Sequence, residues 1–396
     1  MTGCFNILGA KLLVGERLEL VEGAALVVED GRILSIGEPK PGVGNVDLSS
    51  KLLCPMFVNA HCHLGDTGLK ELGLDLQMEE VLNPPDGLKH KELQKFSKAK
   101  LIQFMRHGLV EMLYNGIIAC ADFREQGLDG VRMLRMAAEG LPIQVIILGR
   151  MAEGASKAET LKEANLILAE ANGLGIRDVE SYPAEVLYQL RQEYPEKIFA
   201  CHVSERREAE TDSFVKTGLG QTAQALKWAP DILVHLVHTP ASELRTAGAK
   251  GVFAVSCPRS NGVLGDGLPN LAEWRRQGLT FCLGTDNVMF CAPNMLREME
   301  MASRLTRGLE ESPVAVSALE ILKSATINGA RALGLDREVG SLSAGKQASF
   351  IVFNLDSRNL KYSKDLINAI VHRADTTDIN AIYVMGKPLE NFCLEN

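Results

Sequence analysis

Between residues 53 and 335, short apolar runs of strand length alternate with longer segments of helical period. Helical period recurs in four segments, near residues 91–114, 129–139, 156–171 and 183–193. The apolar runs provide eight strand candidates, which are LLCPMFVNAH, NGIIACADF, PIQVIILGR, GLGIRDV, KIFACHV, DILVHLV, GVFAVSC and LTFCLGTD. Strands that alternate with helices form parallel βα units. Eight such units within about 280 residues predict a closed (β/α)8 TIM barrel better than an open sheet.

Both ends of the chain have a different texture. The first fifty residues alternate short apolar runs with turns, and Asp30-Gly31 stands between two β-rich stretches as a hairpin turn does. This pattern predicts a small antiparallel sheet. Similar stretches return near the other end, with Gly345-Lys346 and Gly386-Lys387 as turn signals. Because the two ends of a domain often lie together, we expect one sheet domain from residues 1–54 and 336–396, beside a barrel over 55–335.

Charge and composition narrow the classes of partner. The chain has 42 Lys and Arg against 50 Asp and Glu, a net charge of −8, and no basic run longer than two residues. We therefore expect no nucleic-acid partner. No apolar run approaches the ~20 residues of a membrane span, and the first ten residues lack a signal pattern, so we expect no membrane partner and a cytoplasmic location. The nine scattered cysteines never form CxxC, which favours buried reduced thiols.

Five polar residues fall at the ends of strand candidates. His61 and His63 flank one residue, so both imidazoles lie on the same face of an extended strand. His202 ends the fifth candidate, His235 ends the sixth, and Asp286 ends the eighth. In a barrel these ends meet at the carboxyl-terminal mouth. The nitrogen and oxygen atoms there are the ligands that Zn²⁺ or a similar divalent ion prefers, so the set predicts a metal site.

A structural interpretation competes with this one for each histidine alone. A single histidine at a strand end is more often satisfied by backbone groups, and the HxH pair is short enough to arise by chance. His90, His107 and His372 are assigned such structural roles. The set of five residues at separate strand ends is much harder to explain by chance.

Several motifs carry a resemblance to a known family. They are FVNAHCHLGD, HVSE, LVHLVH, CPRSN, LGTDN and the tail TINGARALGLDREVGSLSAGKQASFIVF. Together they resemble the amidohydrolase superfamily, in the branch of cytosine/guanine-type deaminases, S-adenosylhomocysteine deaminases and triazine chlorohydrolases. The resemblance covers nearly the whole chain. It implies an α/β fold, a (β/α)8 TIM barrel with a small β-sandwich domain built from both chain termini.

The resemblance also implies roles for particular residues. The metal ligands would be His61, His63, His202 and Asp286. Glu205 would be the proton shuttle and His235 would contact the metal-activated water, with Asp286 also taking part in catalysis. Binuclear members bridge two ions with a carboxylated lysine on the fourth strand, and GLGIRDVESY has no lysine. One divalent ion is therefore expected, with Zn²⁺ the first choice and Fe²⁺ or Mn²⁺ compatible with the same ligands.

The spacing of Glu205 helps to choose the reaction. Departure of ammonia needs a proton and departure of chloride does not, so the acid in HVSE favours deamination. The leading hypothesis is an aminohydrolase that converts an amino-substituted purine, pyrimidine, pterin or triazine into its oxo product, with hydroxide provided by the metal. One alternative is a hydrolase of the same fold that cleaves a ring-chloride, ring-thioether or cyclic amide bond. Another is a scaffold subunit without catalysis. For Glu205 alone, the structural alternative is a solvated acid at a helix start.

The substrate is expected to be a small molecule. Arg150 and Arg259 follow strand candidates, and each can fork onto a carboxylate or phosphate or can brace loops through a salt bridge. His238 is a further candidate for a substrate contact. The long segment 65–89, with Pro84-Pro85 and several glycines, is expected to cover the pocket. The resemblance leaves a homo-oligomer open.

Overall fold

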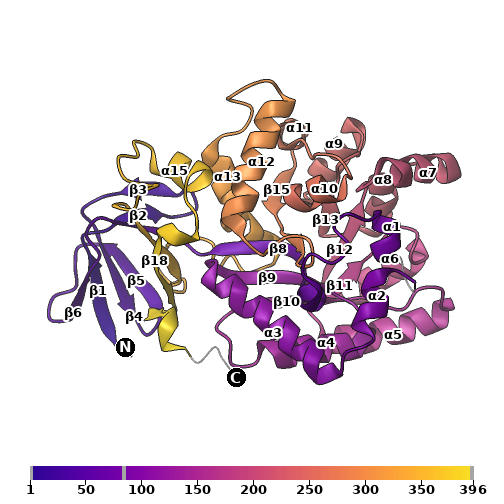
Figure 1. Ribbon diagram of the computed structural model, residues 1–396, viewed down its shortest axis with the longest axis horizontal. Coiled ribbons are helices and arrows are strands. Elements are labelled where there is room, and N and C mark those ends of the chain that lie inside the picture. The colour runs from indigo at the N-terminus through magenta and orange to yellow at the C-terminus, as the bar shows by residue number, and fades with distance from the viewer. Residues whose placement is uncertain (1–2, 83–85, 393–396) are drawn as a thin grey trace.

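The computed structural model describes residues 3–82 and 86–392, and a curled parallel sheet forms its centre (Figure 1). The strand order is β15-β14-β13-β12-β11-β10-β9-β8-β16. The strands are β8 Phe57–His63, β9 Ile117–Arg124, β10 Gln144–Gly149, β11 Gly173–Ile176, β12 Ile198–Val203, β13 Ile232–His235, β14 Phe253–Ser256, β15 Thr280–Leu283 and β16 Asp286–Asn287. β15 and β16 are consecutive in the chain but lie at opposite ends of this order, so the sheet curls until its ends meet. Each of the eight sequence candidates overlaps one of these strands.

The strands of this sheet are apolar because helices cover them. Every residue of β8 and of β9 is buried, as expected for parallel strands with both faces covered. The flanking helices are α3 Lys98–Tyr114, α4 Gly127–Ala138, α5 Lys157–Glu170, α6 Ala184–Glu193, α7 Arg207–Thr217, α8 Gln221–Ala225, α9 Ala241–Ala249, α10 Pro258–Leu264, α11 Leu271–Arg276, α12 Met295–Leu309, α13 Ala318–Ser324 and α14 Ile327–Ala332. The expected mixed α/β class is confirmed.

One predicted helix begins too early. Instead of a continuous helix near 91–114, the chain forms α2 Leu88–Leu93 and then α3. The break occurs because the Ser97 side chain accepts a hydrogen bond from the Lys100 amide and thereby caps a new helix. The other three predicted helices match α4, α5 and α6 to within two residues at each end.

The segment after β8 folds over the mouth of the sheet as short helices. They are the 3₁₀ turn η1 Leu64–Leu69, then α1 Met78–Leu82 and α2. Met78, Leu82 and Lys89 line the cavity that holds the histidine cluster described below. Pro84 and Pro85, which were part of the predicted covering segment, lie outside the described residues.

Two smaller sheets lie beside the central one (Figure 1). The first has the order β5-β4-β1-β6, and the second has the order β19-β18-β17-β7-β2-β3. Their strands are β1 Cys4–Leu8, β2 Lys11–Val14, β3 Glu19–Val21, β4 Ala25–Glu29, β5 Arg32–Gly37, β6 Gly44–Asp47, β7 Lys51–Pro55, β17 Phe350–Asn354, β18 Ile379–Val384 and β19 Lys387–Pro388, with α15 Leu366–His372 between β17 and β18. β7 pairs with β17, which joins the two ends of the chain in one sheet.

The prediction of a single antiparallel sheet near the start of the chain is wrong. The strands of that region belong to two sheets, and β1 pairs with β6 in parallel, as β2 does with β7. Alternating apolar runs do not show which runs pair, and this is why the sequence missed the division. The Asp30-Gly31 turn is confirmed between β4 and β5, with positive φ at both residues, as a tight hairpin turn requires.

The cysteines and the helix lengths bear on two further predictions. Eight cysteines there are free, seven of them buried and Cys4 partly exposed, whereas Cys393 lies outside the described residues. Across residues 3–82 and 86–392, none of the helices combines the length and hydropathy that a bilayer crossing requires.

Candidate metal centre and active site

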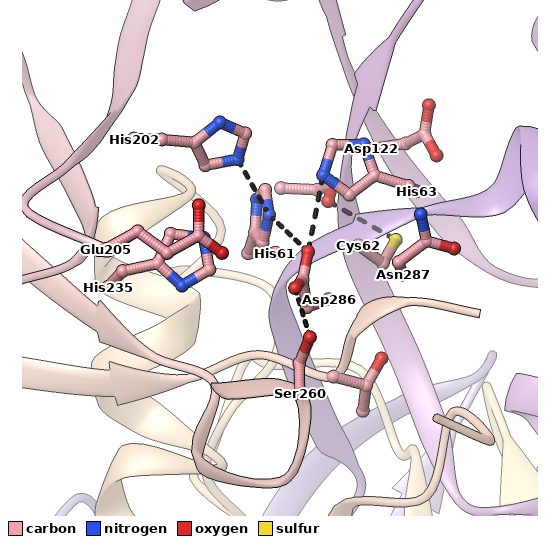
Figure 2. Close-up of polar contacts among 12 residues, drawn as sticks. His61, Cys62, His63, Asp122, His202, Glu205, His235, Ser260, Asp286 and Asn287 are labelled. Atoms are coloured by element: carbon pink, nitrogen blue, oxygen red, sulfur yellow. Dashed lines mark hydrogen bonds and ion pairs between the residues drawn. The ribbon is translucent and has the colours of Figure 1, made fainter. Parts of the chain in front are cut away.

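Four side chains from three strands of the curled sheet meet at its mouth (Figure 2). His61 and His63 end β8 and point the same way because strand residues alternate between faces. The Asp286 Oδ1 atom lies 3.1 Å from His61 Nε2 and 3.3 Å from His63 Nε2. The Nε2 atom of His202, on β12, lies 3.2 Å from His61 Nε2. The structure thus brings together the four residues that the sequence analysis named as ligands.

The separations of His61 from Asp286 and His202, and of His63 from Asp286, are of the size found between two ligands of one small cation. Ligand atoms placed tetrahedrally at 2.0–2.1 Å from Zn²⁺ lie about 3.3 Å from one another. The tautomer of His202 fits as well, since its Nδ1 donates a hydrogen bond to the Arg177 carbonyl, at 3.0 Å, and the neutral ring then turns the lone pair of Nε2 toward His61. The lone pair of His202 Nε2 then points into the cluster, where it can bind a cation. The donor set therefore suits a divalent metal ion.

The electrostatics keep the His61 and His202 imidazoles neutral and the Asp286 carboxylate charged. Burial lowers the pKa of His61 to about 3 despite its hydrogen bond with Asp286, and burial together with the neighbouring imidazoles also lowers the pKa of His202. Burial opposes ionisation of Asp286, but its hydrogen bonds with His61 and His63 outweigh burial and hold its pKa well below the usual range. Neutral imidazole and ionised carboxylate are the forms that bind metals.

Residues behind the cluster hold it in place. The Ser260 hydroxyl donates a hydrogen bond to Asp286 Oδ2 and orients that carboxylate. The Asn59 amide donates to the Thr285 hydroxyl at 2.7 Å, and its carbonyl oxygen accepts from the Thr285 amide at 3.0 Å. Asn59 belongs to β8 and Thr285 links β15 to β16, so this pair fixes the seam where the ends of the sheet meet.

Glu205 and His235 lie beside the four-residue cluster. Glu205 follows β12, and its Oε1 atom lies 3.4 Å from Nε2 of His235, at the end of β13. The Asn261 amide lies 3.1 Å from His235 Nδ1, and donation to Nδ1 leaves the proton of His235 on Nε2, which faces Glu205. His235 has a φ of 77°, a strained value that is concentrated at functional sites.

The Glu205 carboxyl has a raised pKa and therefore holds a proton more readily than an ordinary carboxyl. Burial, and after it the negative charge of Asp286, raises the pKa of Glu205 to about 8. At neutral pH most of this carboxyl is therefore protonated. An acid of this kind beside a polar pocket can donate a proton to a bound molecule.

The three candidate substrate residues lie in different places. Arg150 lines the cavity that contains His202 and Glu205, and it pairs with Glu125 at 3.2 Å. Arg259 instead binds the buried Glu298 at 3.2 Å and faces a separate hollow. His238 is also outside the cavity, because its Nε2 atom donates to the Asp266 carbonyl at 2.6 Å. Of the three, the structure brings only Arg150 to the cluster.

Several residues of the cavity wall were not predicted from the sequence. Lys89 and His90 reach the cavity from α2, and Asn287 reaches it from β16. No spacing signal marks Lys89, since LKHKEL looks like an exposed basic helix. Asn287 directly follows Asp286 and was available as a candidate from its position at a strand end.

Comparisons with known proteins agree with this geometry. The sequence model of the amidohydrolase family matches residues 52–389. The chain belongs to the amidohydrolase family. A putative aminohydrolase of Methanothermobacter thermautotrophicus is 33% identical over 370 residues, which cover 91% of this chain and 93% of the relative. A 5-methylthioadenosine/S-adenosylhomocysteine deaminase of Acetivibrio thermocellus is 27% identical and covers 96% of this chain and 90% of its own length.

Solved structures share the fold. The zinc complex of an atrazine chlorohydrolase from Arthrobacter aurescens superposes with a TM-score of 0.85, at 19% identity, over 99% of this chain and 97% of that one. At that identity the likeness concerns the fold alone. Membership of the family, together with its deaminase-named relatives, makes the chain a hydrolytic enzyme of the amidohydrolase type that acts on C–N bonds.

Proposed function

We propose that this chain is a metal-dependent aminohydrolase that deaminates an amino-substituted heterocycle and releases ammonia. The observation that carries the proposal is the buried carboxyl of Glu205, whose pKa is raised to about 8 and which lies in the same cavity as the histidine and aspartate cluster. The amino group leaves as ammonia only after it takes up a proton, and a protonated carboxyl in the cavity provides that proton.

We further propose one ion per chain, held by His61, His63, His202 and Asp286. Zinc is the first choice because nitrogen and oxygen ligands suit it, with Fe²⁺ or Mn²⁺ also compatible. In the described residues, the groups of side chains close enough to share a metal ion come from β8, β12, β13 and β16 and include Glu205. None of these groups includes a residue of β11, the fourth strand, where binuclear members have the bridging lysine. When bound, such an ion lowers the pKa of water and thereby supplies hydroxide at neutral pH.

The protein's own groups have separate tasks in this proposal. Asp286 accepts the proton that water loses as its oxygen attacks the ring carbon. Glu205 gives its proton to the adjacent ring nitrogen, which removes negative charge from the ring. The Nε2–H of His235 donates a hydrogen bond to the oxygen at the tetrahedral carbon. Glu205, now ionised, takes the remaining proton of the attacking oxygen and passes it to the amine, which leaves as ammonia while the ring keeps the oxygen as a carbonyl. The proton on Asp286 returns to Glu205 and restores both carboxyl groups.

We also infer the domain organisation. We propose that the curled sheet is a (β/α)8 barrel over residues 55–335, and that residues 1–54 and 336–396 form one β-sandwich. A continuous apolar cluster supports the sandwich, because it contains Phe5 and Ile7 of the first small sheet and Leu12, Leu53 and Phe350 of the second. The free cysteines favour a reducing compartment, and we propose the cytoplasm.

Relatives named as deaminases of 5-methylthioadenosine and S-adenosylhomocysteine direct the choice of substrates to test. The experiment measures ammonia release by metal-loaded protein from a panel of aminopurines, aminopyrimidines, aminopterins and aminotriazines. We expect turnover of at least one aminopurine derivative and a loss of about 10²- to 10⁴-fold in kcat in Glu205→Gln, with an unchanged metal content.

The alternative is a hydrolase of the same fold that acts on a ring-chloride, ring-thioether or cyclic amide. It keeps the metal cluster but gives no role to the acid form of Glu205. Turnover of such a substrate by a protein that is silent on the whole amine panel would overturn the deaminase proposal. Glu170→Gln is the matched control, since Glu170 is a surface acid that pairs with Arg132 and lies far from the cavity lining.

A further inference from the structure

A buried network of ion pairs forms one wall of the active-site cavity. Lys89 Nζ lies 2.8 Å from Asp66 Oδ2 and 2.9 Å from Glu125 Oε1, and the Lys89 side chain is only 5% exposed. Arg150 Nη2 lies 3.2 Å from the same Glu125 oxygen. Asp66 also accepts a hydrogen bond from the Asn287 amide at 2.7 Å. The network therefore connects α2, the ends of β9 and β10, and β16, next to the candidate ligand Asp286.

This network changes what Arg150 can do. Its two cations, Lys89 and Arg150, face two carboxylates, Asp66 and Glu125, so the charges balance. An incoming carboxylate or phosphate gains little from an arginine whose charge is already matched. Arg150 is thus placed to hold Glu125 rather than to fork onto an anion.

Glu125 is the member of the network that still offers an acceptor to the cavity. Burial opposes its ionisation, but the charges of Lys89, Arg150 and Arg124 outweigh burial and hold its pKa well below the usual range. Both neighbouring cations bind Oε1, and in the described part of the chain no hydrogen bond or ion pair takes Oε2. Glu125 lines the cavity, and 14% of its side chain is exposed. Its unpartnered Oε2 atom is not buried.

We propose that Glu125 determines specificity by accepting, through Oε2, a hydrogen bond from a hydroxyl group on the substituent of the heterocyclic substrate. This proposal rests on the proposed function and assigns a residue to it. A hydroxyl fits better than an ammonium group, because it donates a hydrogen bond to Oε2 without adding a charge to a network whose charges already balance. It fits better than an anion, because Oε2 is itself part of a carboxylate.

The test is direct binding of two reaction products, hypoxanthine and its ribonucleoside inosine, which differ by a hydroxylated sugar. Calorimetry with the metal-loaded wild-type protein is expected to show tighter binding of inosine. In Glu125→Gln, the amide oxygen is expected to stay with the donors Lys89 and Arg150, so that an NH2 group replaces the Oε2 acceptor. Inosine binding is then expected to weaken by about 10- to 100-fold, as for loss of a hydrogen bond to a charged group, and hypoxanthine binding by less than about 2-fold.

A second variant distinguishes a local loss of binding from a folding defect. Glu125→Asp keeps the charge that Lys89 and Arg150 need but withdraws the carboxylate by one bond of about 1.5 Å. It is expected to melt near the wild-type temperature and to show the same selective loss for inosine, while the surface control Glu170→Gln shows none. Equal losses for both ligands, no loss in either variant, or wild-type protein that does not prefer inosine overturns the assignment of Glu125. Because binding is measured without turnover, a protein that keeps this selectivity but releases no ammonia contradicts only the deaminase proposal.

Discussion

The carboxyl of Glu205 is buried beside Asp286, and its raised pKa of about 8 leads to a pH-dependence. A general acid works in its protonated form, so kcat/KM is expected to stay level below the pKa and to fall about tenfold per pH unit above it. A cation at the cluster favours the ionised form, so the fall begins at or below pH 8 in the metal-loaded enzyme. The measurement is a profile of kcat/KM from pH 6 to 10.

The Glu205→Gln variant is the control for that profile. The amide that it introduces cannot titrate, so the falling limb at this pKa is expected to disappear along with most of the activity. A limb that stays unchanged in the variant assigns the ionisation to another group and contradicts the role of Glu205 as the acid.

At the scale of elements, the seam between β15 and β16 depends on Gly284. A Cβ atom at this position would lie 2.8 Å from both Cβ and the carbonyl oxygen of His61, contacts that backbone atoms cannot relieve. Gly284→Ala is expected to lower the free energy of unfolding by about 1–3 kcal/mol and to reduce the metal content, because it displaces a candidate ligand. Chemical denaturation and elemental analysis measure these two effects.

Gly308→Ala provides the matched control within α12. A Cβ atom there meets nothing within 4 Å, and the residue is exposed. Alanine favours a helix over glycine, so this variant is expected to be about 0.5–1 kcal/mol more stable with its metal content unchanged. A Gly284→Ala protein that behaves like this control contradicts the account of the seam.

The strands and helices also differ in how far they could be predicted from the sequence. The strands of the central sheet were predictable because buried parallel strands are continuous apolar runs, and a polar cluster at its mouth was predictable because His61, His63, His202, His235 and Asp286 end such runs. The choice of four of these residues as metal ligands came from the family resemblance. Pairing of the terminal strands was not predictable, because apolar runs do not specify partners. Nor was the position of Lys89, since a lysine becomes buried only when distant carboxylates such as Asp66 and Glu125 meet it in the fold.

At the scale of the whole molecule, the two small sheets and the curled sheet contribute differently. Phe350 on β17 is fully buried between the small sheets and stacks on Tyr383, with 4.9 Å between ring centroids. Phe350→Ala is expected to lower the free energy of unfolding by about 3–5 kcal/mol. The metal content and kcat of the folded protein are expected to stay at wild-type values, since the active-site residues lie on the curled sheet.

Denaturant unfolding and kinetics below the transition measure this separation. Loss of metal from Phe350→Ala protein that is still folded is the contrary result, because it means that the terminal sheets shape the active site directly. That outcome also removes the support for treating residues 1–54 and 336–396 as a separate domain.

The central claim is that three imidazoles and one carboxylate hold a single divalent ion. Its most direct measurement is a crystal structure with anomalous diffraction at the metal edge, combined with elemental analysis of the same protein. The account predicts one ion per chain, bound by Nε2 of His61, His63 and His202 and by the Asp286 carboxylate, and absent from a His202→Ala variant. Protein that takes up no ion when dialysed against zinc, iron or manganese, or an ion bound by other residues, contradicts it.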